Sequence, residues 1–379
     1  MAAGPVLEAS TALELVAALS RRYGSKPAWV LAGGGNSSFK DASRLWVKAS
    51  GTSLATIEPS GFCEMKRDAL AAIWTKTYPA EASAREEAAL ADLMAARASG
   101  ETRRPSVETL MHGFFPQAFV LHTHPALVNG LTCGKEGEAI FRELFADEAI
   151  WVPFVDPGYI LAKTVRDAFE EWSRKKAAIP SIMFMQNHGL LVAADTPEGI
   201  DRLSESVISR LQGRLGRSPD SKAVAVDAGR LAAAVSGVAA LAPAGSFIAQ
   251  HADADILAFA ASKEAFTPLS SAFTPDHIVY AGHEFLYASG PDALEGAWKD
   301  YRSRNGSDPR VLAVAGVGAL AIASTQAAAS TALALFQDAT AIAVYSESFG
   351  GALHMTAGKI DFIRNWEVEK YRAKAAPQG

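Results

Sequence analysis

The pattern of apolar and polar positions predicts a helix and then a strand–turn–strand motif at the start of the chain. An amphipathic period over 11–23 indicates a helix, opened by a capping box at Thr11. A strand is expected at 29–32, a glycine-rich turn at 33–38 and a second strand at 44–49. This motif offers amide and hydroxyl donors in its turns.

The rest of the first half alternates between helical and strand periods. Glu108 lies on a short helix that Pro105 opens, and His188 lies in a turn between two strands. The predicted elements are helices at 83–98, 105–112 and 196–215, and strands at 118–124, 182–186 and 190–194.

A polar linker with glycine and proline at 216–220 predicts a domain boundary. We expect a metal-binding α/β domain at 1–217 and a second α/β domain at 218–379. The second half contains strand signals at 246–250, 255–260, 277–280 and 311–322, and helix signals at 292–303, 325–343 and 361–374.

One stretch of the first half is echoed in the second. The segment 187–196 resembles 316–325, at an offset of 129 residues, and Val317 stands where the first segment has His188. Both combine a glycine turn, an apolar strand and a long helix. A degenerate second copy explains this likeness, and so do two unrelated strand–helix units of similar composition.

Composition narrows the class of protein. Of 379 residues, 49% are hydrophobic and 20% charged, which is typical of a soluble globular chain, and the net charge of -5 gives no basic surface for nucleic acid. Two cysteines are too few for a disulfide framework. The N-terminus has no signal-peptide pattern, and glycines interrupt the apolar run 311–322, which reads as a buried strand or hairpin. We therefore expect a cytoplasmic protein without membrane or nucleic-acid partners.

Three histidines form a candidate metal site. His122 and His124 are two residues apart on a predicted strand, so their side chains point to the same face, and His188 projects from a tight turn. Three histidines with an open fourth position are typical of a catalytic zinc. A strand histidine pair alone is more often structural, but Glu108, Pro125 and the glycine-rich loop strengthen the metal interpretation.

In combination, these motifs resemble the class II aldolase/adducin family over about residues 10–215. The full length, as far as Trp366 and Glu367, is most similar to the long rhamnulose-1-phosphate aldolase branch. Some members of that branch continue into a dehydrogenase domain, and this sequence has no dinucleotide fingerprint. The motifs that carry the resemblance are Gly35-Asn36-Ser37-Ser38, Ser50-Gly51, Pro105-Ser106-Val107-Glu108, His122-Thr123-His124-Pro125 and Asn187-His188-Gly189-Leu190.

The resemblance implies a three-layer α/β/α fold with a mainly antiparallel central sheet. It implies a Zn²⁺ ion held by His122, His124 and His188, although other divalent transition metals would fit similar ligands. Such enzymes cleave a carbon–carbon bond of a ketose phosphate through an enediolate that the metal stabilises. Glu108 matches the acid/base. The substrate phosphate is expected at Asn36, Ser50, Gly51 and Ser106.

The sequence departs from the family pattern at two places. Val107 stands where a second serine often binds the phosphate. Phe154 stands at the position of a tyrosine that protonates the aldehyde-side oxygen from a neighbouring subunit, and Tyr159 is the candidate replacement. Lys40 and Lys48 flank the glycine-rich turn and either add positive charge or are solvated. His112 either orients Glu108 or ends its helix.

The leading hypothesis is therefore a metal-dependent aldolase acting on a small sugar or sugar phosphate. The alternatives are a pentulose-phosphate 4-epimerase, another zinc lyase, or a non-catalytic adducin-like scaffold. Epimerases tend to carry aspartate at the Glu108 position, and adducins lack the complete histidine set. The resemblance also implies a closed homo-oligomer.

Overall fold

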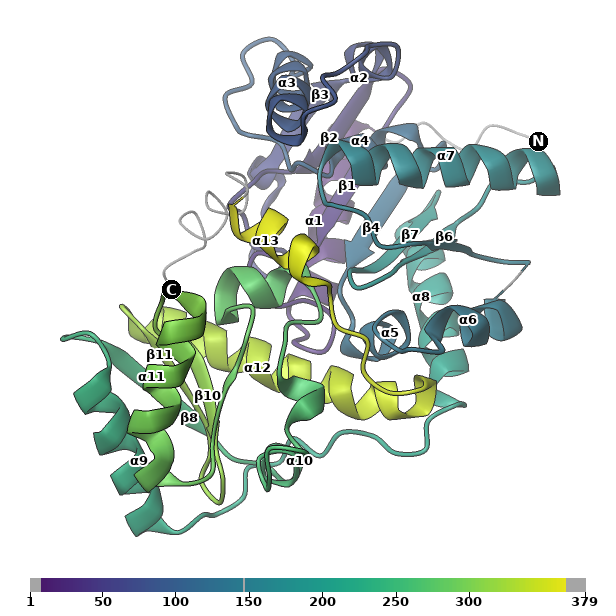
Figure 1. The fold of residues 1–379 in the computed structure, drawn as a ribbon. Coiled ribbons are helices and arrows are strands. Elements are labelled where there is room, and N and C mark those ends of the chain that lie inside the picture. The colour runs from purple at the N-terminus through teal and green to yellow at the C-terminus, as the bar shows by residue number, and fades with distance from the viewer. Residues whose placement is uncertain (1–7, 146, 366–379) are drawn as a thin grey trace. The chain divides into compact units, whose positions relative to one another are not determined.

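The computed structural model describes residues 8–145 and 147–365, and their contacts divide the chain into two compact units (Figure 1). Unit 1 contains residues 8–128 and 141–210, and unit 2 contains 129–140 and 211–365. The predicted boundary at 217 lies close to the change at Arg210. The segment Asn129–Ile140, predicted in the first domain, groups with unit 2.

A seven-stranded sheet runs through the described part of unit 1, in the order β3-β2-β1-β4-β7-β6-β5. Its neighbouring strands pair antiparallel except β5 and β6, which are parallel, so the sheet is mixed. The strands are β1 (Asn36–Lys40), β2 (Arg44–Lys48), β3 (Phe62–Lys66), β4 (Phe119–Thr123), β5 (Ile150–Val152), β6 (Ile182–Met185) and β7 (Gly189–Ala194).

Helices cover both faces of this sheet. On one face, α4 and α7 pack with α2 and α3 over a core that includes Val47, Val120 and Leu191. On the other face, α1 lies against β1, and a hydrogen bond joins the Ser20 and Ser37 hydroxyls. The helices of this half are α1 (Ala9–Gly24), α2 (Arg67–Ile73), α3 (Ala82–Ala95), α4 (Thr109–Phe114), α5 (Ala126–Thr132), α6 (Gly137–Phe145), α7 (Tyr159–Lys176) and α8 (Pro197–Gln212).

Several predicted boundaries in unit 1 are wrong, for local reasons. Residues 29–32 form turns, and the strand begins at Asn36, inside the predicted glycine-rich turn. Helix α1 begins before Thr11, so the predicted capping box does not cap it. Helix α3 is capped by Glu81 and not by Ser83. Glu108 is the N-cap residue of α4 and not an interior helix residue.

Unit 2 contains a four-stranded sheet in the order β8-β11-β10-β9, counted over the residues described. Its core packs Leu312, Leu320 and Val314 against α9 and α11, and α12 lies against β8 and β11. The elements are α9 (Ala228–Leu241), β8 (Phe247–His251), α10 (Ala254–Phe259), a π-helix (His277–Ala281), β9 (Leu286–Ala288), α11 (Leu294–Asn305), β10 (Val311–Val314), β11 (Gly318–Ala323), α12 (Gln326–Ser346) and α13 (Ala357–Asn365). Short 3-10 turns lie at Pro59–Gly61, Thr267–Leu269, Pro291–Ala293 and Glu347–Phe349.

The hairpin expected at 311–322 is present as β10 and β11, and the helices expected at 292–303 and 325–343 are α11 and α12. The strands expected at 255–260 and 277–280 are wrong. The first is helix α10, because Asp253 caps it by accepting the Ile256 N–H. The second is the π-helix. The predicted final helix is described only as α13, and its part beyond Asn365 lies outside the described residues.

The apolar stretch Gln326–Phe349 is long enough to cross a membrane by length and composition. However, 56% of its apolar window is buried inside the protein, as in the core helix of a soluble domain. It is weak evidence for a membrane span.

Candidate metal centre

The three predicted histidines come together at one end of the unit 1 sheet. Their ligand atoms all lie within 4.8 Å of one another. The Nε2 atom of His122 is 3.0 Å from that of His124 and 3.3 Å from that of His188. His122 and His188 are buried and His124 is partly buried. Convergent imidazole nitrogens are the donor set that divalent transition metals prefer, so these residues fit a bound ion.

His122 is held with its Nε2 atom facing the cluster. Its Nδ1 atom lies 2.9 Å from the Leu190 carbonyl oxygen and donates a hydrogen bond to it. That bond leaves the Nε2 lone pair free for a metal. Burial lowers the pKa of His122 to about 3, so the ring is neutral at physiological pH, as a metal ligand must be.

The Glu108 carboxylate lies beside the histidines. Its Oε1 atom is 3.1 Å from His188 Nε2 and 3.6 Å from His122 Nε2. Burial alone raises the pKa of Glu108, but the histidines that face it outweigh burial, and the net pKa lies well below the ordinary value. Glu108 is therefore an ionised base next to the metal position.

Asn36 holds the other oxygen of Glu108. The Asn36 side-chain amide donates a hydrogen bond to Glu108 Oε2. The sheet register places Asn36 opposite His122, so this contact follows from the β1–β4 pairing. Within the described part of the chain, the buried Asn36 Oδ1 atom has no hydrogen-bond partner and is left to accept one from a ligand.

The turn before Asn36 requires glycine. Gly35 has a φ of +67°, and a Cβ atom there would lie 2.8 Å from the His122 carbonyl oxygen. This close approach fixes the distance between β1 and the metal-bearing strand.

The predicted anion-binding residues gather from two segments beside this site. Ser50 donates its backbone N–H to the Arg104 carbonyl, and Ala49 bridges to Pro105, so Ser50 and Gly51 lie next to Ser106. The Ser106 hydroxyl accepts the Glu108 N–H at 3.2 Å. The structure thus places the residues expected to bind the anion at the start of α4, next to Glu108.

Neither of the flanking lysines is solvated. Lys48 is 4% exposed, and its Nζ atom donates to the carbonyls of Gly33 and Thr52, which joins the glycine-rich turn to the Ser50–Gly51 loop. Lys40 is also 4% exposed and donates to the Gln117 carbonyl at 2.6 Å.

Burial lowers the pKa of Lys40 from 10.5 to about 7. Between these values the unfolded chain holds one more proton than the folded chain, so the wild-type free energy of unfolding rises with pH. Replacing Lys40 with Met removes this pH-dependent contribution to the free energy of unfolding. We expect Lys40→Met to stabilise the protein more at pH 6 than at pH 9, by about 2 to 3 kcal/mol. Urea unfolding at both pH values measures the difference. The exposed Lys176→Met is the control, and an equal effect at the two pH values would contradict the prediction.

His112 does not orient Glu108. Its Nδ1 atom lies 2.8 Å from the Ser38 hydroxyl, and burial lowers its pKa to about 3. Asn36 and Ser38 are two residues apart on β1 and lie on the same face, and Glu108 and His112 are one helical turn apart. The Asn36–Glu108 and Ser38–His112 hydrogen bonds therefore lie one after the other along the contact between β1 and α4. The role expected of His112 is performed by Asn36. The i, i+2 spacing of Asn36 and Ser38, matched with the i, i+4 spacing of Glu108 and His112, was the sequence signal that could have predicted the Asn36–Glu108 contact.

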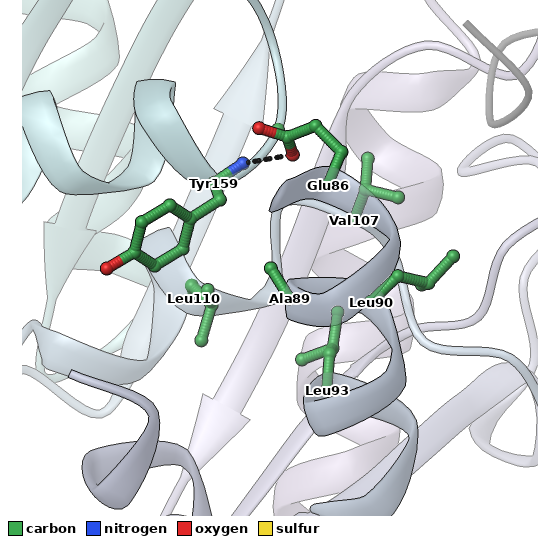
Figure 2. Close-up of a pocket in the computed structure, with 8 residues that line it drawn as sticks. Glu86, Ala89, Leu90, Leu93, Val107, Leu110 and Tyr159 are labelled. Carbon is green, nitrogen blue, oxygen red and sulfur yellow. Dashed lines mark hydrogen bonds between the residues drawn. The ribbon is translucent and has the colours of Figure 1, made fainter. Parts of the chain in front are cut away.

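Val107 points into an apolar pocket formed with α3. Figure 2 shows Val107 facing Leu90 and Leu93, with Glu86 and Tyr159 at the rim. A serine hydroxyl at this position would lie among apolar side chains. Valine in place of the family's second serine therefore fits the apolar packing at this position.

Glu86 caps helix α7 from a different helix. The α7 N-cap is Gly158, which has no side chain, and the Tyr159 N–H instead donates to Glu86 at 2.8 Å (Figure 2). We expect Glu86→Ala to cost about 1 to 2 kcal/mol, because it removes this acceptor from the helix start. Thermal unfolding, with the adjacent exposed Glu87→Ala as control, measures the loss. Equal stability of the two variants would show that the cap is unimportant.

Tyr159 does not lie beside the histidine cluster of its own chain. Its ring contacts Trp74 and Tyr78, at centroid distances of 6.0 and 4.7 Å, rather than the histidine cluster. Phe154 lies near β6, where its N–H donates to Gln186. The aldehyde-side acid therefore stays a prediction.

Taken together, the sheet, the histidine cluster and the adjacent carboxylate define an α/β protein with a candidate metal site. The model of the class II aldolase and adducin N-terminal domain matches residues 14–207, just over half of the chain. The protein belongs to this family, and unit 1 has the class II aldolase fold.

Known proteins similar to this chain extend the comparison. An uncharacterized oxidoreductase, YuxG, from Bacillus subtilis (strain 168) is 24% identical over 397 residues, which cover 91% of this chain and 56% of that protein. The chain thus spans about half the length of this curated relative. A class II aldolase domain from Thermoplasma acidophilum is 29% identical, with a TM-score of 0.46, over 56% of this chain and 96% of the domain. The L-fuculose 1-phosphate aldolase from Glaciozyma antarctica PI12 is 13% identical, with a TM-score of 0.35, over 56% and 77%.

Proposed function

We propose that the protein is a metal-dependent aldolase that cleaves or forms a carbon–carbon bond in a ketose phosphate or a related anionic sugar. The observation that carries this proposal is the convergence of His122, His124 and His188 with one oxygen of Glu108 facing them. A non-catalytic scaffold needs neither three converging imidazoles nor a carboxylate beside them. Membership of the class II aldolase family supports the same chemistry.

The three imidazoles would hold one divalent ion, for which we propose Zn²⁺. Such an ion would act as a Lewis acid toward the negative charge that develops on substrate oxygen atoms during cleavage. His122 and His188 are buried, so the charge would be stabilised where water is largely excluded.

Glu108 is the proposed acid/base. In the cleavage direction the ionised carboxylate first takes up a proton, from the substrate hydroxyl or from water, and then delivers it to the carbon that loses its partner. In the synthetic direction it removes the same proton. Asn36 holds Oε2, so Oε1 is the oxygen directed toward the reacting atoms. Holding the carboxylate in one orientation reduces the entropic cost of proton transfer.

The substrate anion is proposed to lie between Asn36 and the Ser50–Gly51 and Ser106 segments. Backbone and hydroxyl donors from such turns suit phosphate oxygens. Lys48 bridges the same loops and adds a positive charge. The first ketose to assay is rhamnulose 1-phosphate, because we expect this chain to belong to the rhamnulose-1-phosphate aldolase branch.

Tyr159 is the proposed aldehyde-side acid, acting in the site of a neighbouring copy within a homo-oligomer. We expect Tyr159→Phe to lower kcat at least tenfold, because proton transfer from a positioned side chain contributes about 10²-fold or more. Bound metal should be unchanged. Steady-state kinetics with Tyr78→Phe as the matched control measure the effect. Full activity in Tyr159→Phe would remove this residue from the mechanism.

Metal content and a retro-aldol screen together test the proposed function. The protein is purified without added metal, its metal is measured per chain, and ketose 1-phosphates are assayed against the matching unphosphorylated ketoses. We expect about one metal per chain and a preference for the phosphorylated sugars. Epimerisation without free aldehyde would instead establish the epimerase. The absence of bound metal after zinc addition would overturn the proposal in favour of a scaffold.

A further inference from the structure

The two units contain the same four-stranded arrangement. Strands β4-β7-β6-β5 of unit 1 and β8-β11-β10-β9 of unit 2 follow the same order. In both, the first two pairings are antiparallel and the last is parallel. In each set of four, the last two strands along the chain form a hairpin, which is β6 and β7 in unit 1 and β10 and β11 in unit 2. Each hairpin leads into a long helix, α8 or α12.

The two hairpins also agree residue by residue. A shift of 129 residues moves the closing pair Met185–Gly189 onto Val314–Gly318. The His188 N–H donates to the Met185 carbonyl at 3.1 Å, and the Val317 N–H donates to that of Val314 at 3.0 Å. The preceding turn residue has positive φ in both, 53° at Asn187 and 70° at Gly316.

The strand beside each hairpin, β4 in unit 1 and β8 in unit 2, follows the same register. Phe119 pairs with Ala194 in unit 1, and Phe247 pairs with Ala323 in unit 2. A Cβ atom on Gly189 would lie 2.4 Å from the Thr123 carbonyl oxygen, and one on Gly318 would lie 2.5 Å from that of His251. Strand order, hairpin hydrogen bonds and this close contact are separate features. Their agreement is not expected of two unrelated strand–helix units.

We infer that unit 2 is a degenerate copy of the metal-bearing half of unit 1, and that it keeps the backbone of a second metal site whose ligand positions are Gln250, Ala252 and Val317. These positions correspond to His122, His124 and His188 through the shared register. An amide, a methyl and an isopropyl group do not form a divalent-metal site, so the copy has lost its ligands.

A positive charge lies at the corresponding turn of unit 2. The Arg230 guanidinium donates to the Ala315 carbonyl at 3.0 Å and lies 3.3 Å from the place of a Cβ on Gly316. This charge disfavours a divalent cation beside it. The residues at these three positions and the place of Arg230 lead to the same conclusion, that this site in unit 2 no longer holds a metal ion.

Restoring the histidines tests this inference. The variant Gln250→His/Ala252→His/Val317→His is made with and without Arg230→Gln, in the wild-type and the His122→Ala chains. We expect one additional cobalt or zinc ion per chain in each background, with the visible absorption of cobalt bound by nitrogen ligands. A control that carries Val317→Ala in place of Val317→His should bind the ion at least tenfold more weakly. Folded variants that bind no more metal than their parents overturn the inference.

The inference rests on the unit 1 cluster being a metal site, but the test separates the two. A wild-type chain without metal, combined with a restored variant that binds one ion, would contradict the proposed function and support the duplication.

If no histidine variant folds, the close approach of Gly318 to the His251 carbonyl oxygen, which matches that of Gly189 to Thr123, is tested by substitution. Gly318→Ala should lower the Tm by roughly 5 °C more than Gly282→Ala, because Gly282 has a φ of +100° against +113° at Gly318 but its Cβ position lies no nearer than 3.8 Å to another atom. Equal Tm values would overturn the shared register and with it the duplication.

Discussion

Glu108→Gln should lower the retro-aldol rate by about 10² to 10⁴-fold while leaving the bound metal in place. Gln keeps the size of the side chain and can still interact with Asn36 and His188, but it cannot take up a proton and deliver it to the reacting carbon. The loss should appear in kcat, because the residues proposed to bind the substrate anion, Ser50, Gly51 and Ser106, are unchanged. Steady-state kinetics and metal content, measured on one preparation, give both quantities.

The matched control for this variant is Glu170→Gln. Glu170 is an exposed carboxylate on α7 that pairs with Arg166 one turn away, so its loss should leave kcat within about twofold. If Glu108→Gln retains the wild-type rate, the proton is carried by another group. If it loses metal as well as activity, Glu108 acts as a ligand rather than as a base.

His122→Ala should abolish metal binding and lower the activity by about 10³-fold or more. A Lewis acid contributes several kcal/mol to a reaction that develops charge on oxygen, and each 1.4 kcal/mol is tenfold in rate. His122 has the largest effect because its Nε2 atom is within 3.3 Å of both other ligand nitrogens, and its ring is completely buried. Elemental analysis and the retro-aldol assay measure the two losses.

His283→Ala is the control for metal specificity. His283 is in unit 2, where its Nε2 atom pairs with Asn305, so its removal should change neither metal content nor rate. Retention of a full complement of metal by His122→Ala would show that the ion is held elsewhere.

The convergence of the three histidines could be predicted from the sequence because their geometry is local. His122 and His124 share a face through strand alternation, and His188 follows a residue with positive φ in a two-strand turn. The strands that carry them are short and apolar, and the prediction placed them within about a residue of their observed bounds.

The surroundings of the site could not be predicted, because they depend on contacts between distant segments. The bond from Asn36 to Glu108 and the bond from Lys48 to the Gly33 carbonyl become apparent only when the sheet register is known. The sequence also misplaced the start of α4, because Pro105 suggested a helix start that the chain delays until Thr109. For that reason Glu108 was expected on a helix face, whereas it lies at the helix N-cap.

In unit 2, apolar runs were confused with strands. Residues 277–280 are buried almost on every side, and a run of this kind has no period that distinguishes a strand from a helix. The hairpin at β10 and β11 was recognised because Gly316 and Gly318 mark its turn.

The pairing of β1 with β4 and of β4 with β7 has a consequence for folding. Asn36 meets His122, and His122 meets Leu191, so the site joins segments that are far apart in the chain. Forming such contacts requires closing long loops, which slows folding and leaves the site among the late structures to form. A metal ion that binds only the completed sheet would then act after the folding transition state. It would slow unfolding much more than it speeds folding, so chelation should shorten the lifetime of the native chain with little change in its rate of formation.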